Sequence, residues 1–225
     1  MTSLIAAALA FLAIHLAVSG TRLRDAIVSG IGEGPYRGLF SLASIATIVW
    51  LCIAFNRATA GHDVPLFDSG HFRDMGVVMI FLAFALAVPG VARRSPTSVG
   101  GESTTQVDGV LRITRHPFLW GVMLWSAFHL IANGTLGTAI FFGTFFLVAA
   151  IGTRAIDGKM RRNRPAQWRA VAASTSNIPF AAIAAGRNKF AVREYFNWRL
   201  GLAVVLFAGF LVFHERLFSV SPFPA

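Results

Sequence analysis

Apolar and polar positions form long alternating blocks along this chain. Six apolar runs stand out, near residues 3–20, 38–55, 74–92, 118–132, 135–153 and 200–218. Most of them approach the ~20 residues that a helix needs to cross a bilayer. The pattern predicts an all-α protein, a polytopic transmembrane bundle of about six helices that forms a single domain over residues 1–225 and has the lipid bilayer as its partner.

The connections between the runs add detail to this expected bundle. Asn133 and Gly134 separate the fourth run from the fifth, which predicts a tight helical hairpin. The fourth run covers only about 24 Å at 1.5 Å per residue, so it need not cross fully. Cytoplasmic loops are expected at about 93–117, where a glycine-rich polar stretch predicts a flexible connection, and at 154–199, where basic and aromatic residues predict a segment on the membrane surface.

The charge is strongly basic and unevenly distributed. Twenty Lys and Arg stand against ten Asp and Glu, which gives a net charge of +10. Seventeen of the basic residues fall in alternate connections that share one side, and three fall on the other. By the positive-inside rule the seventeen face the cytoplasm and both termini are periplasmic. Because topology explains the charge and no nucleic-acid-binding motif is present, no nucleic-acid partner is expected.

Two of the histidines inside apolar runs are candidate functional residues. His15 belongs to the first run, and His129 belongs to the fourth, with Trp125 and Ser126 one turn earlier on the same face. Ionisable groups in membrane helices are costly and suggest function, although a histidine hydrogen-bonded within the bundle is the simpler alternative. Neutral imidazoles on two helices are a common way to hold haem, so His15 and His129 are candidate axial ligands of the haem iron. Helix geometry alone matches His15 in depth more naturally with His116.

The stretch RITRHPFLWG, residues 112–121, begins the fourth run. Arg112, Arg115 and His116 form an ordinary cytoplasmic flank, and Pro117 suits a first helical position. The same residues also suit an anion site, because a helix N-terminus beside arginines can hold a haem propionate, a lipid phosphate or a cofactor carboxylate.

The loop HDVPLFDSGHFRD on the opposite side contains residue types that bind metals. They are His62, Asp63, Asp68, His71 and Asp74. Their irregular spacing makes this a weak metal-site hypothesis. His214, near the end of the last run, is interpreted as an interfacial residue.

Several motifs together resemble the NnrU family over nearly the whole chain. They are SGTRLRD (19–25), PYRGLFSL (35–42), GVLRITRHPFLWG (109–121), WSAFHLIANG (125–134) and TSNIPFAAIAAGR (175–187). The resemblance implies a multi-helix protein of the bacterial inner membrane with a link to nitrite and nitric-oxide reduction, that is, to denitrification.

The same motifs resemble 15-cis-zeta-carotene isomerase, a membrane enzyme that uses haem b. This resemblance implies haem ligands at His129 and, with an offset of two residues, at His15. The isomerase has a cysteine three residues before the second histidine, where this chain has Ser126. Together with the link to denitrification, it implies a redox or isomerase role and a hydrophobic small molecule or a redox partner. Helix geometry makes His116 the alternative ligand, and the helix start at Pro117 makes Arg112 and Arg115 the anion contacts.

A more distant similarity connects RHPFLWG with isoprenylcysteine and phospholipid methyltransferases. In those enzymes the RHP core is followed by an acidic pair, whereas this chain has only Asp157 in the corresponding stretch. The similarity implies S-adenosylmethionine as the alternative cofactor, with His116 near its carboxylate. A non-catalytic assembly or regulatory role is the third interpretation, so the sequence leaves open whether the protein is an enzyme.

Overall fold

A computed structural model of the protein describes residues 1–225 except 20, 62, 94–104 and 224–225, and it does not describe the side chains of residues 71 and 73. The described part is helical, and its one β-bridge joins Pro65 to Thr135. The elements in chain order are α1 (Thr2–Leu12), π-helix η1 (Ala13–Val18), α2 (Arg22–Ile31), α3 (Glu33–Thr59), 3₁₀-helix η2 (Gly70–Met75), α4 (Gly76–Val91), α5 (Val110–Ile113), α6 (Pro117–Asn133), α7 (Leu136–Asn163), α8 (Pro165–Ser174), α9 (Ala181–Ala184), α10 (Val192–Tyr195) and α11 (Trp198–Phe218). The expected all-α class is confirmed.

Each of the six apolar runs forms helix in the structure. Three helices, α3, α7 and α11, are long and apolar enough to cross a membrane, and a fourth span is added if the bent pair Thr2–Val18 and Arg22–Ile31 counts as one. The helices α4 and α6 have 16 and 17 residues, which is about 24–26 Å of helix against a ~30 Å hydrocarbon core. A full set of six spans stays a prediction.

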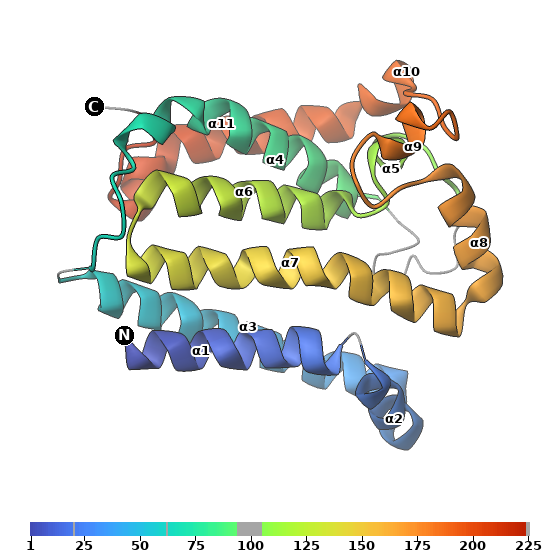
Figure 1. Ribbon diagram of the computed structural model, residues 1–225, viewed down its shortest axis with the longest axis horizontal. Helices are drawn as coiled ribbons and strands as arrows, with labels where there is room; N and C mark the ends of the chain where they lie inside the picture. The colour runs from blue at the N-terminus through green and yellow to red at the C-terminus, as the bar shows by residue number, and fades with distance from the viewer. Residues whose placement is uncertain (20, 62, 94–104, 224–225) are drawn as a thin grey trace.

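Helix α7 lies in the middle of the molecule, with α6 on one side and α1 on the other (Figure 1). Helix α3 packs against α1, while α4 packs on α6 and α11 on α4. The α1–α3 contact uses small residues, since Ala7 and Ala8 meet Ala54 in one buried cluster. The α4–α6 contact is closer still: a Cβ atom added at Gly121 would lie 2.6 Å from the Ala83 carbonyl oxygen. Small side chains therefore determine how closely these helices approach.

The two ends of the bundle differ. Both chain termini and the α6–α7 connection lie at one end, whereas α2, α5, α8, α9 and α10 lie at the other (Figure 1). The latter end carries sixteen of the twenty basic residues within the described part of the chain, and it is called the basic end below. The arrangement places the basic residues as the alternating loops predicted. That this end faces the cytoplasm stays a prediction.

Large apolar side chains cover the outside of the long helices. On α3 and α11 the exposed ones include Leu39, Leu42, Ile45, Val205 and Val212. A water-soluble monomer rarely exposes continuous apolar surface of this kind. The exteriors of these helices fit a lipid bilayer.

Candidate functional site

The residues of RITRH form a paired loop at the basic end. Helix α5 ends at Ile113 because Thr114 is extended, and α6 begins at Pro117. The backbone N–H of Arg115 donates to the Ser176 carbonyl at 3.0 Å, and the N–H of Phe180 donates to the Ile113 carbonyl at 2.8 Å. The start of α6 is thus held against the TSNIPF segment, residues 175–180, some sixty residues further along the chain.

Arg115, His116 and Asp157 form a buried cluster below this loop. The Arg115 guanidinium donates to Asp157 through Nη2 at 2.5 Å and through Nε at 2.9 Å. The Nε2 atom of His116 lies 2.7 Å from Oδ1 of the same carboxylate. The three side chains are only 13%, 1% and 8% exposed, in the order Arg115, His116, Asp157. From the sequence, Asp157 was notable only because it stands alone where the methyltransferases have an acidic pair. In the structure it is the centre of this cluster.

His116 is a hydrogen-bond donor in this arrangement. Burial lowers the pKa of His116, against an opposing effect of its hydrogen bond to Asp157. An ionised carboxylate only accepts hydrogen bonds, so a neutral His116 carries its hydrogen on Nε2 and donates it to Asp157. That nitrogen is therefore occupied, which removes support from His116 as an alternative haem ligand.

Arg112 forms a second ion pair close by, with Glu194 of α10. Its Nε and Nη2 atoms lie 2.7 and 2.9 Å from the two carboxylate oxygens. The carboxylate also accepts the Gly109 N–H at 2.9 Å, and Arg112 Nη1 donates to the Asn188 side chain at 2.8 Å. Both arginines of the expected anion site are thus paired with carboxylates of the chain itself. An external anion at Arg115 has to displace Asp157.

His15 lies in the six-residue π-helix η1 that follows α1. Such segments are rare and occur often at functional sites. The ring Nδ1 lies 2.9 Å from the Phe11 carbonyl, one turn earlier, and the half-buried ring stacks on Phe11 at 4.1 Å between ring centroids. Phe40 of α3 contacts the His15 ring edge-on, at 5.3 Å between ring centroids.

His129 has a similar environment in α6. Its Nδ1 lies 2.8 Å from the Trp125 carbonyl, and its ring stacks on Phe142 of α7 at 4.6 Å. The Trp125 ring lies 5.2 Å away. Ser126, in the place of the isomerase cysteine, is buried and donates to the Val122 carbonyl of its own helix at 2.7 Å.

The two histidines lie on opposite sides of α7 and at different depths. Phe11 and Trp125 both contact Phe145, each at 5.5 Å. Helix α1 runs toward the basic end and α6 runs away from it (Figure 1). His15 is therefore one turn beyond Phe11 toward the basic end, and His129 is one turn beyond Trp125 in the opposite direction. At ~5.4 Å per turn the histidines are about 11 Å apart along the bundle, with the rings of Phe11, Phe145 and Trp125 between them.

The acidic loop at the other end of the bundle is used to fix a helix start. Asp63 accepts the Thr135 hydroxyl at 2.6 Å and the Gly137 N–H at 2.9 Å, and so caps α7. His62 and the side chain of His71 lie outside the described residues. Over the part of the chain that is described, no group of three or more His, Cys, Asp or Glu residues is placed to hold a metal ion.

The scarcity of acidic residues in the segment 154–199 could have identified the partners of Arg112 and Arg115. Between residues 154 and 199 the only acidic residues are Asp157 and Glu194, among ten basic ones. Each pairs with one arginine of RITR. Asn177 had no such signal, although it accepts from Trp120 Nε1 at 3.3 Å and donates to Thr153 at 3.0 Å.

The fold and these contacts define a class: a multi-pass α-helical membrane protein whose basic end is held together by ion pairs between residues far apart in the chain. A family profile described as NnrU protein matches residues 3–222, and the chain belongs to the NnrU family. Searches of curated proteins and of solved structures found no match to the chain.

Proposed function

We propose that this NnrU protein binds haem b within the helical bundle, with His129 as an axial ligand of the iron. The observation that supports this is the hydrogen bond of His129 Nδ1 to the Trp125 carbonyl at 2.8 Å. Because a carbonyl only accepts, Nδ1 carries the hydrogen and the lone pair is on Nε2. Ligating histidines are commonly oriented in this way by a backbone carbonyl.

The surroundings of His129 suit an apolar macrocycle. Phe142 stacks on the ring and Trp125 lies beside it, so the walls next to this half-buried histidine are aromatic. His15 has the same tautomer, fixed by the Phe11 carbonyl, and fits as a ligand taken singly.

One iron held by both histidines does not fit the packing described. Axial ligands on two faces of one haem must lie at the same depth, whereas His15 and His129 are about 11 Å apart along the bundle. Phe11, Phe145 and Trp125 would also have to move aside. His129 is therefore the proposed ligand, and His15 is a candidate second ligand only if α1 shifts along α7.

A bound haem would supply redox chemistry or a site for a small diatomic ligand such as nitric oxide. The chain itself orients the His129 ring through the Trp125 carbonyl. A redox role linked to nitrite or nitric-oxide reduction, or isomerisation of a polyene, belongs to this proposal together with a redox partner or a hydrophobic substrate. The alternative cofactor, S-adenosylmethionine, has less support, because His116 and Arg115 are occupied by Asp157.

The test is the visible absorption spectrum of the purified full-length protein after expression with added haem precursor. We expect a haem band that is lost in His129→Ala and kept in the matched control Ser126→Ala, whose hydroxyl bonds only to its own helix. His15→Ala should retain the bound haem. A spectrum without haem, or the same haem content in His129→Ala as in the unmodified protein, would refute the proposal.

A further inference from the structure

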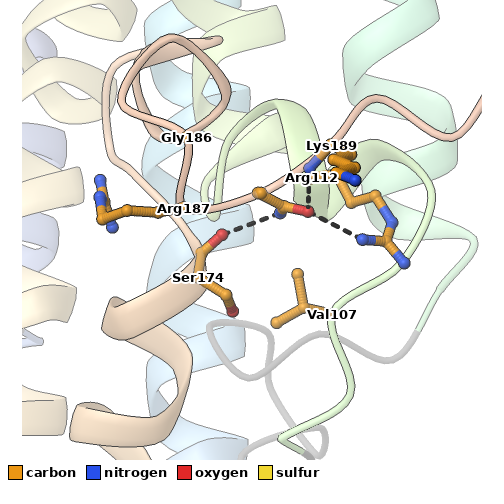
Figure 2. Close-up of a pocket in the computed structure, with 7 residues that line it drawn as sticks. Val107, Arg112, Ser174, Gly186, Arg187 and Lys189 are labelled. Atoms are coloured by element: carbon orange, nitrogen blue, oxygen red, sulfur yellow. Dashed lines mark hydrogen bonds between the residues drawn. The ribbon is translucent and has the colours of Figure 1, made fainter.

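A cavity of about 400 Å³ lies at the basic end, beside the Arg112–Glu194 pair (Figure 2). It is formed by the end of α8, the loop that follows α9 and the segment around α5. The residues that line it are Val107, Arg112, Ser174, Gly186, Arg187, Asn188 and Lys189. Three of them are basic and none is acidic.

Hydrogen bonds hold the walls of this cavity in place. Asn188 donates to the Ser174 carbonyl at 2.8 Å and accepts from Arg112 Nη1 and the Lys189 N–H, each also at 2.8 Å. Arg187 Nη1 donates to the carbonyls of Ala172, Ala173 and Thr175, at 2.9 to 3.1 Å, where α8 ends. In Figure 2, Arg187 and Arg112 lie on opposite sides of the cavity. The walls are thus positioned without a ligand.

Among the described residues, the positive charge of the cavity is incompletely balanced. Glu194 pairs with Arg112. Neither Arg187 nor Lys189 forms an ion pair with a described residue, and the Lys189 side chain is exposed. Two cations next to a partly neutralised guanidinium favour an anion, and phosphate oxygens match these donors.

An apolar strip connects the cavity to the membrane helices. Immediately after Lys189, the exposed residues Phe190, Val192, Phe196 and Trp198 lead into α11. The Tyr195 hydroxyl donates to the Ala85 carbonyl of α4 at 3.0 Å, which fastens this segment to the bundle. Aromatic side chains beside Lys and Arg at the end of membrane helices are typical of the headgroup region of a bilayer.

We propose that this cavity binds the phosphate of an anionic phospholipid, between Lys189 and Arg112, with the acyl chains along the apolar strip. A free phosphate needs only the cavity, whereas a phospholipid also uses the adjacent exposed aromatic residues. The strip therefore favours the lipid as the source of the phosphate. The inference is independent of haem binding.

The experiment is native mass spectrometry of the purified full-length protein with phosphatidylglycerol or phosphatidylcholine in the micelle. We expect retained phosphatidylglycerol and little phosphatidylcholine. Lys189→Gln should reduce the retained phosphatidylglycerol about tenfold, as the loss of one charge-assisted bond to phosphate predicts. Arg193→Gln removes the same charge from an exposed position outside the cavity and is the matched control. It should change retention less than about twofold.

Three outcomes would overturn the proposal. If Lys189→Gln and Arg193→Gln lost equal amounts of phosphatidylglycerol, the lipid would be attracted to the basic end as a whole. If Lys189→Gln retained as much phosphatidylglycerol as the unmodified protein, the cavity would not hold the lipid. Inorganic phosphate that raises the melting temperature as much as phosphatidylglycerol does would assign the cavity to a free anion. Equal melting temperatures of the two variants without lipid are the control for folding.

Discussion

The Nε2 atom of His116 lies 2.7 Å from the Oδ1 atom of Asp157, 41 residues further along the chain. This contact joins the residue immediately before α6 to the basic end of α7. Arg115 donates to the same carboxylate and strengthens the connection. Within the stretch RITRHPFLWG, Arg115 and His116 therefore pair with an internal anion, the Asp157 carboxylate, whereas Arg112 pairs with Glu194.

Asp157→Asn should destabilise the protein strongly. The substitution leaves Arg115 buried without a countercharge, and removing one partner of a buried pair costs about 3–5 kcal/mol. We expect a large drop in the thermal unfolding temperature in detergent. Asp25→Asn is the control, because Asp25 is more exposed and bonds Arg24 at 3.2 Å, so its loss should cost about 1 kcal/mol or less. Equal effects of the two substitutions would contradict a central role of the cluster.

Gly121→Ala should push α4 and α6 apart. The new Cβ atom would lie 2.6 Å from the Ala83 carbonyl oxygen and 2.7 Å from the Ala87 Cβ atom. Overpacking of this kind costs about 1–3 kcal/mol. At Gly143, in α7, a Cβ atom meets nothing within 4 Å, so Gly143→Ala should be neutral or slightly stabilising. Thermal unfolding of the two variants measures the difference, and a neutral Gly121→Ala would show that these helices are not so closely packed.

The Arg112–Glu194 pair should contribute to stability in a pH-dependent manner. The hydrogen bond that Arg112 donates to Glu194 lowers the pKa of the Glu194 carboxyl below its ordinary value of 4.5. A carboxyl with a lowered folded pKa adds stability that is complete above its unfolded pKa and is lost as the pH falls through the folded pKa. The unmodified protein should therefore exceed Glu194→Gln in unfolding temperature at neutral pH, and the gap should close below about pH 4.5.

The size of this pH effect is limited, because the Glu194 side chain is 37% exposed. An exposed pair contributes about 1 kcal/mol or less. Glu215→Gln, at the opposite end of α11, serves as the control and should show no gap at neutral pH. If the difference between Glu194→Gln and the unmodified protein stayed constant as the pH fell, the carboxylate would not be the cause.

Asp63→Ala should destabilise the start of α7. The substitution removes the acceptor of the Gly137 N–H and of the Thr135 hydroxyl, and loss of a helix cap costs about 0.5–2 kcal/mol. Asp74→Ala, an exposed carboxylate in the same loop, should change the unfolding temperature much less. A chelator should not reproduce the effect. A chelator-sensitive unfolding temperature would instead support the metal-site hypothesis for this loop.

The partners of the candidate site residues could not be predicted from the sequence, because they depend on contacts between residues far apart in the chain. The sequence identified Arg112, Arg115 and His116 as a unit, yet the structure divides them between two carboxylates, Asp157 and Glu194. Local periodicity carries no information about which acidic residue folds back on which arginine. The same holds for His15 and His129, whose apolar positions were visible but whose separation by Phe145 was not.

By itself the sequence determined the helical class, the positions of the six apolar helices and the concentration of basic residues in alternate loops. These features follow from hydrophobic periodicity and from the length of apolar runs, which are local properties. Only the tertiary structure decided which helices pack together, which rings lie between His15 and His129 and which charges neutralise one another. These depend on close packing at Gly121 and on hydrogen bonds between residues far apart in sequence, and both exist only once the helices have assembled.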